Sequence, residues 1–147
     1  MSRMIFVNLP VADLARSVAF YEAVGFTRNP QFSDDTAACM VLTDVIHVML
    51  LTHDKFRQFA PREIGDARRT TSAILCISCE DRAAVDQMTE SALAAGSTEP
   101  NEPDEYGFMY GRSFEDPDGH LWAPMWMDVS ALDGRPAGEV AAELAAG

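Results

Sequence analysis

The strongest constraint on the fold is a pattern that occurs twice along the chain. Asp13 and Asp81, 68 residues apart, each stand between a short apolar segment and a helix-like apolar stripe. An Asp side chain in this place caps the first turn of a helix. Gly25 and Gly96 then stand where a helix ends in the left-handed conformation, and strand-like segments follow each of them. The chain therefore predicts strand, helix and three strands, twice over, in an α+β fold.

The pattern also predicts how the chain is divided. We expect a single domain over residues 1–128, followed by a tail or short terminal helix at 129–147. The domain divides into halves at 4–52 and 71–128, joined by a connector at 53–70. This connector holds five of the eleven basic residues. We expect it to be either an exposed linker, a flap over a pocket or a hinge between the halves. The expected strands are 5–10, 26–32, 37–42, 45–51, 72–78, 106–115 and 120–128, and residues 97–103 turn back after the second helix as 26–32 do after the first. A short helix is expected around 55–59.

The last two strands are joined by a tight turn, Asp116-Pro117-Asp118-Gly119. Asp-Pro-Asp-Gly-His followed by an apolar and an aromatic residue resembles the closing hairpin of the vicinal oxygen chelate superfamily. That superfamily includes glyoxalase I, extradiol dioxygenases and the fosfomycin- and bleomycin-resistance proteins. The segment from Val11 to Phe26 also looks like its first half, so the resemblance covers roughly residues 4 to 128 and is greatest to an uncharacterised glyoxalase-like bacterial subgroup. It implies two βαβββ repeats whose curved mixed sheets surround a cavity.

The enzymes that this chain resembles hold one divalent metal with His, Glu or Gln side chains. When the metal-ligand positions of these enzymes are carried over to this sequence, they fall at Phe6, Met49, Ser72 and Ala123. These side chains cannot chelate a hard divalent ion. The resemblance therefore implies no cofactor, and a metal such as Zn, Ni, Mn or Fe only with a non-standard ligand set that includes His47.

The same register predicts an inner surface that suits a mostly apolar small molecule with a few polar groups. His47 is either a catalytic candidate or a pocket-lining or core residue, and Arg112 either anchors an anionic group or pairs with an acidic neighbour. Asp116 and Asp118 are expected to form the turn, and His120 to serve the turn or solvent. The predicted ligand-binding residues are Phe6, Asn8, His47, Met49, Ser72, Tyr106, Tyr110, Arg112, Ser113, Ala123 and Met125.

Two functions are compatible with these residues, and a third remains open. The first is a metal-independent small-molecule binder, as the resemblance to bleomycin-resistance proteins implies. The second is a lyase, isomerase or dioxygenase, lactoylglutathione-lyase-like or extradiol-dioxygenase-like, in which His47 and a Tyr or Arg transfer protons. The third is an assembly protein that uses its exposed sheet edges. The resemblance also implies a homodimer, since one protomer's half can complete another's sheet.

Composition excludes some partners. The formal net charge of −12 disfavours nucleic acids and anionic membrane surfaces. No apolar run approaches the roughly 20 residues of a membrane span, and the start is too short for a signal peptide. Three cysteines, an odd number, agree with a reducing compartment. Cys76 and Cys79 fall on one predicted strand, where they would face opposite ways, so no redox role is expected. We expect a cytoplasmic protein.

Overall fold

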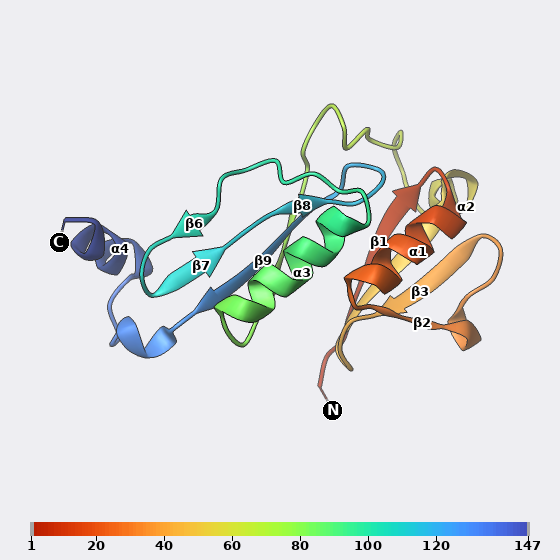
Figure 1. The fold of residues 1–147 in the computed structure, drawn as a ribbon. Coiled ribbons are helices and arrows are strands. Elements are labelled where there is room, and N and C mark those ends of the chain that lie inside the picture. Colours follow the sequence, from red (N-terminus) through yellow and green to blue (C-terminus); the bar gives the residue numbers. More distant parts are fainter. Residues whose placement is uncertain (1, 147) are drawn as a thin grey trace.

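Two sheets lie side by side in the computed structural model of the protein, which describes residues 2–146 (Figure 1). Met1 and Gly147, the ends of the predicted domain and tail, lie outside the described residues. The strand order is β1-β4-β3-β2 in the first sheet and β5-β9-β7-β6 in the second, where β8 also pairs with β9. Both sheets are mixed, because β1 runs parallel to β4 and β5 runs parallel to β9. The predicted α+β class is confirmed, and the sheets are open rather than closed into a barrel.

The first half follows the predicted order with one shortened strand. β2 ends at Asn29 because Pro30, which has no N–H to donate, begins a 3₁₀ turn. The elements of this half are β1 (Ile5–Val11), α1 (Leu14–Val24), β2 (Thr27–Asn29), η1 (Pro30–Phe32), β3 (Ala37–Val41), β4 (Ile46–Thr52) and α2 (His53–Arg57).

The second half differs from prediction at residues 106–115, which do not form one strand. β7 pairs with β9 up to Gly111, and β8 resumes the same register at Phe114. Between them Arg112 lies opposite Pro124, which accepts a hydrogen bond from Arg112 N at 3.1 Å and has no N–H to return. The elements are β5 (Ile74–Ser78), α3 (Arg82–Ala94), β6 (Asp104–Glu105), β7 (Met109–Gly111), β8 (Phe114–Glu115), β9 (Leu121–Met127), η2 (Val129–Ala131) and α4 (Ala137–Ala146).

The predicted helix ends are confirmed. The Asp13 carboxylate accepts a hydrogen bond from Arg16 N at 3.1 Å, and Asp81 accepts one from Ala84 N at 2.7 Å. Gly25 and Gly96 follow the two helices with φ of 119° and 101°, the left-handed conformation that glycine adopts without strain. Local sequence alone therefore fixes where α1 and α3 begin and end.

The two halves share one hydrophobic core. α1 and α3 lie next to each other on the same side of the sheets (Figure 1). Tyr21 of α1 meets Trp122 of β9 edge to face at 5.9 Å between ring centroids, and Trp122 stacks on Phe114 at 6.4 Å. Phe20 and Phe26 complete this aromatic cluster. Because the contacts cross from one half to the other, neither half buries its aromatic residues alone.

The C-terminal segment forms the short turn η2 and the helix α4, which lies at one end of the molecule (Figure 1). Of its side chains, Val140 is buried and Leu144 is about half exposed, beside Gly107. No helix within residues 2–146 has the length and apolar character needed to cross a membrane.

Candidate functional site

The pairing of β1 with β4 brings four of the predicted ligand-binding residues onto one face of the first sheet. Phe6 lies opposite His47, and Asn8 lies opposite Met49. Side chains alternate along a strand, so the neighbouring residues Leu9, Val48 and Leu50 point the other way, into the core beneath α1. We call the face with Phe6, Asn8, His47 and Met49 the open face of the first sheet.

A partly exposed aromatic ring and a buried imidazole form the centre of this open face. The Phe6 and His47 rings stack with centroids 4.5 Å apart and planes 16° from parallel. Phe6 is 46% exposed, whereas His47 is only 9% exposed. The His47 Nδ1 atom is buried and has no hydrogen-bond partner among the residues that the structure describes. A buried polar atom without a partner is unfavourable, so a hydrogen-bond partner from outside the chain would stabilise this nitrogen.

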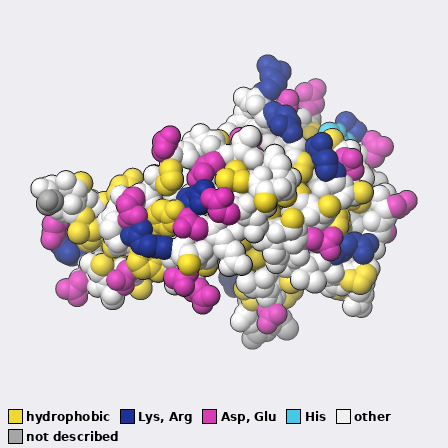
Figure 2. Space-filling view, viewed as in Figure 1, with side chains coloured by type: hydrophobic (Ala, Val, Ile, Leu, Met, Phe, Trp, Pro, Cys, Tyr) yellow, Lys and Arg dark blue, Asp and Glu magenta, His cyan; other side chains and the backbone are white. Residues whose placement is uncertain are grey.

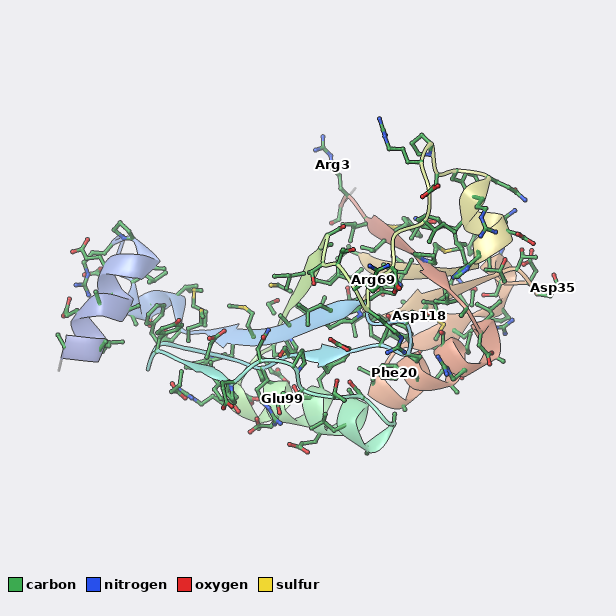
Figure 3. The ribbon with its side chains drawn as sticks, turned by 90° about the horizontal axis from the view of Figure 1, so that it is seen from above. Arg3, Phe20, Asp35, Arg69, Glu99 and Asp118 are labelled. Atoms are coloured by element: carbon green, nitrogen blue, oxygen red, sulfur yellow. The ribbon has the colours of Figure 1, made fainter. Side chains whose placement is uncertain are left out.

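The second sheet has a comparable open face. Ala123 and Met125 on β9 lie opposite Cys76 and Ser78 on β5. Ile74, at the start of β5, is 59% exposed on the same face. α3 covers the opposite face, and Figure 3 shows no described element over the open one. This surface is therefore apolar, methionine-containing and accessible.

Three other predicted residues lie around these faces. Ser113 is buried, and its hydroxyl accepts a hydrogen bond from Asn101 N at 3.3 Å. Tyr106 is 42% exposed between β6 and β7. Ser72 lies between the connector and β5, which begins two residues later than predicted, and it lines a cavity of about 210 Å³ together with Leu9, Phe56 and other residues. The structure thus places Ser72 at the junction of the halves rather than within either open face.

Tyr110 and Arg112 lie on the α3 side of the second sheet, away from the open face. The Tyr110 hydroxyl donates to Asp86 at 2.6 Å. Arg112 donates to both carboxylate oxygens of Glu99 at 2.9 Å, and also pairs with Asp86 at 3.0 Å and Glu90 at 2.9 Å. The hydrogen bond from Arg112 lowers the pKa of Glu99. Figure 2 shows basic side chains interleaved with acidic ones over the second half. Arg112 thus pairs with acidic neighbours and does not point toward a ligand on the open face. The reason is the alternation of side chains along the strand, which turns Arg112 toward α3.

The positions that hold a metal in the superfamily do not fit one here. Phe6, Met49, Ser72 and Ala123 supply no imidazole or carboxylate. Within residues 2–146 no three His, Cys, Asp or Glu side chains are grouped so that they could hold an ion. The one imidazole on the open face, His47, is stacked against Phe6. These residues therefore support no chemical step through a metal.

The closing turn has a role that sequence reasoning missed. Asp116 accepts hydrogen bonds from the N–H groups of Asp118 and His120, both at 2.9 Å, as a turn-forming Asp should. Its second oxygen accepts the Tyr21 hydroxyl at 2.7 Å. His120, expected to serve the turn or solvent, is hydrogen-bonded through Nε2 to the Pro10 carbonyl at 2.9 Å. The turn thus fastens the second half to the first, and no local signal could reveal contacts about 100 residues apart in sequence.

Comparisons with known proteins identify the fold. The family model described as "Bleomycin resistance protein-like N-terminal" matches residues 3–42. No curated protein matches the chain. A glyoxalase/bleomycin resistance protein/dioxygenase family enzyme from Burkholderia phytofirmans is 20% identical with a TM-score of 0.70, over 86% of this chain and 99% of that one. A glyoxalase-related enzyme from Fulvimarina pelagi is 19% identical with a TM-score of 0.70, over 86% and 88% of the two chains.

The chain therefore has the vicinal oxygen chelate fold. Together with the family-model match, this confirms the resemblance to the glyoxalase/bleomycin-resistance/dioxygenase superfamily that the two sequence motifs predicted.

Proposed function

We propose that this protein binds a mostly apolar small molecule on the open faces of its sheets, without a metal. The observation that carries the proposal is the unpartnered Nδ1 of His47 beside the stacked ring of Phe6. An apolar surface with a few well-placed polar groups is typical of small-molecule sites. Phe6 would supply a flat apolar contact, Met49 an adaptable one, and His47 a hydrogen bond that orients the ligand.

A second copy of the chain would enclose this site. The open faces leave Phe6 and Ile74 about half exposed, and large exposed apolar side chains in one region indicate an interaction surface. A homodimer in which each open face meets the partner's would bury these residues and form a closed cavity. The three free cysteines favour a reducing, cytoplasmic setting for this assembly.

A second function, an enzyme of the lyase, isomerase or dioxygenase type, is favoured by the same histidine. An imidazole can accept or donate a proton near neutral pH, and the Nδ1 of His47 has no hydrogen-bond partner within residues 2–146. In this alternative His47 would move a proton on the bound molecule rather than only orient it.

The first test is the metal content of the purified, untagged protein, with thermal unfolding measured against Mn, Fe(II), Co, Ni and Zn. We expect no stoichiometric metal and no melting shift that rises with metal concentration, as binding to the folded state alone would require. A stoichiometric metal would overturn the proposal and make the enzyme the leading function.

The second test is a small-molecule screen by thermal shift, with His47→Ala and the matched control His53→Ala, since His53 lies on α2 outside the open face. Compounds that bind the site should lose their stabilisation in the first variant and keep it in the second. Compounds that stabilise both variants equally would show that the open face is not the site.

A further inference from the structure

A second cleft lies at the junction of the two halves, on the side of the sheets that carries α1 and α3. It has a volume of about 400 Å³, which is within the range of small-molecule sites. α1 contributes Arg16, Ala19 and Phe20, the connector contributes Arg68, and the rest comes from the end of α3 and the closing turn. Figure 3 shows Phe20 and Asp118 at this junction. Its lining residues are Arg16, Ala19, Phe20, Arg68, Ala95, Gly96, Ser97, Thr98, Glu115, Asp116 and Pro117.

Two guanidinium groups meet at one backbone oxygen beside this cleft. Arg16 Nη2 donates to the Pro117 carbonyl at 3.1 Å, and Arg68 Nη2 donates to the same oxygen. The two arginines come from α1 and from the connector, 52 residues apart. Neither forms an ion pair with a carboxylate within the described part of the chain. Two like charges that donate to one oxygen, with no carboxylate in ion-pair contact, repel each other.

The acidic side chains of the lining do not neutralise this pair. The Asp116 carboxylate is buried and accepts hydrogen bonds from Tyr21, Asp118 and His120. Glu115 also lines the cleft but pairs with neither arginine. The arginines retain donors beyond those given to Pro117, and guanidinium groups match carboxylate and phosphate oxygens in two-point contacts.

We infer that this cleft binds a small organic anion through Arg16 and Arg68, at a site separate from the open faces. The anionic group, a carboxylate or a phosphate, would lie between the two guanidinium groups and relieve their repulsion. The apolar part of the molecule would lie against Ala19 and Phe20. Because the connector supplies Arg68, an occupied cleft would also hold the connector to the closing turn.

The experiment uses sodium phosphate and sodium benzoate as probes, each against sodium chloride at equal ionic strength. Thermal unfolding of the full chain is followed as each probe is titrated. We expect a saturating rise in melting temperature with at least one probe, and the probe that acts identifies the anionic group as phosphate or carboxylate. No rise beyond that in chloride with either probe would overturn the inference.

Variants identify the site. Arg16→Gln and Arg68→Gln should each weaken the apparent affinity at least fivefold, whereas Arg69→Gln, a neighbouring arginine outside the cleft lining, should leave it unchanged. Glu115→Gln removes a negative charge from the lining and should strengthen binding. The readout is the probe-dependent shift of each variant, so a change in basal stability does not confuse it.

Equal probe-dependent shifts in the wild type, Arg16→Gln and Arg68→Gln would overturn the inference. If a glutamine variant does not fold, Arg68→Lys keeps the positive charge but loses the two-point geometry, and it should bind more weakly than the wild type. Unchanged affinity in Arg68→Lys would show that the guanidinium is not a ligand.

Discussion

The Tyr21 hydroxyl of α1 donates a 2.7 Å hydrogen bond to the Asp116 carboxylate in the closing turn. The same hydroxyl accepts the indole N–H of Trp122 at 3.0 Å. Tyr21 and Trp122 are almost completely buried, and Asp116 is 4% exposed. Three side chains from both halves therefore form one buried polar network in the middle of the shared core.

Tyr21→Phe is expected to lower the free energy of unfolding by about 1–3 kcal/mol, because it leaves a buried acceptor and a buried indole N–H without partners. Urea unfolding measures this loss. Tyr106→Phe is the matched control, since the Tyr106 side chain is exposed, and it should change stability by less than about 0.5 kcal/mol. Equal effects of the two variants would show that the network contributes nothing.

Asp116→Asn should show a particular dependence on pH. Burial raises the pKa of Asp116 above its ordinary value. The folded protein therefore holds the proton of the Asp116 carboxyl group more tightly than the unfolded chain does, where the pKa of an Asp is about 3.9. The resulting stabilisation is complete below that pH and is lost as the pH rises through the folded-state pKa.

The asparagine variant lacks this titration. The unfolding free energy of the wild type minus that of Asp116→Asn should therefore be largest near pH 4 and decrease toward pH 7. Urea unfolding at several pH values measures it. A difference that increases with pH would contradict the raised pKa.

Arg112→Met should lower the free energy of unfolding by about 1–3 kcal/mol at pH 7. Arg112 is largely buried, and its removal leaves three neighbouring carboxylates without a counter-charge, although their partial exposure limits the loss. Arg57→Met, which breaks an exposed pair with Asp54, is the control and should cost under about 1 kcal/mol.

Acid should reduce the effect of Arg112→Met. The pKa of Glu99 and that of Asp86 are both lowered in the folded protein. The ion pairs stabilise the folded protein fully above the pKa values of these carboxylates in the unfolded chain, about 4. This stabilisation is lost as the pH falls through their lower pKa values in the folded protein. The wild-type advantage, measured by urea unfolding, should decrease below pH 4. An advantage that is constant with pH would argue against the ion pairs.

Gly119→Ala should destabilise the protein by more than the backbone strain of an alanine at positive φ. Gly119 has φ of 92°, and an added Cβ would lie 3.1 Å from backbone atoms of Ala67 and Arg68 in the connector. We expect a cost of about 2–4 kcal/mol from backbone strain and displacement of the connector. Gly134→Ala, also at positive φ but with open space around it, should cost less. Thermal unfolding of the two variants compares these costs.

Phe6→Ser combined with Ile74→Ser should convert the proposed homodimer into a folded monomer. Both side chains are about half exposed in the single chain, so their replacement should cost the monomer little stability. Sedimentation velocity measures the association, and circular dichroism confirms the fold. A dimer that persists in the double variant would place the interface elsewhere.

The sequence by itself determined the elements and their order. Asp13, Asp81, Gly25 and Gly96 act within a few residues of their own positions, so the limits of α1 and α3 could be predicted from local chemistry. Alternation along β1 and β4 is also local, and it places Phe6, Asn8, His47 and Met49 on one face. The motifs at the two ends of the domain identified the superfamily's fold before any contact was known.

Only the tertiary structure decided which distant groups meet. Pro124 interrupts the ladder opposite Arg112, and the strand parity turns Tyr110 and Arg112 toward α3 rather than the open face. The Tyr21–Asp116 bond and the convergence of Arg16 and Arg68 join residues from separate elements. Such contacts depend on how whole halves pack, and packing is set by the sum of many weak interactions rather than by any local pattern.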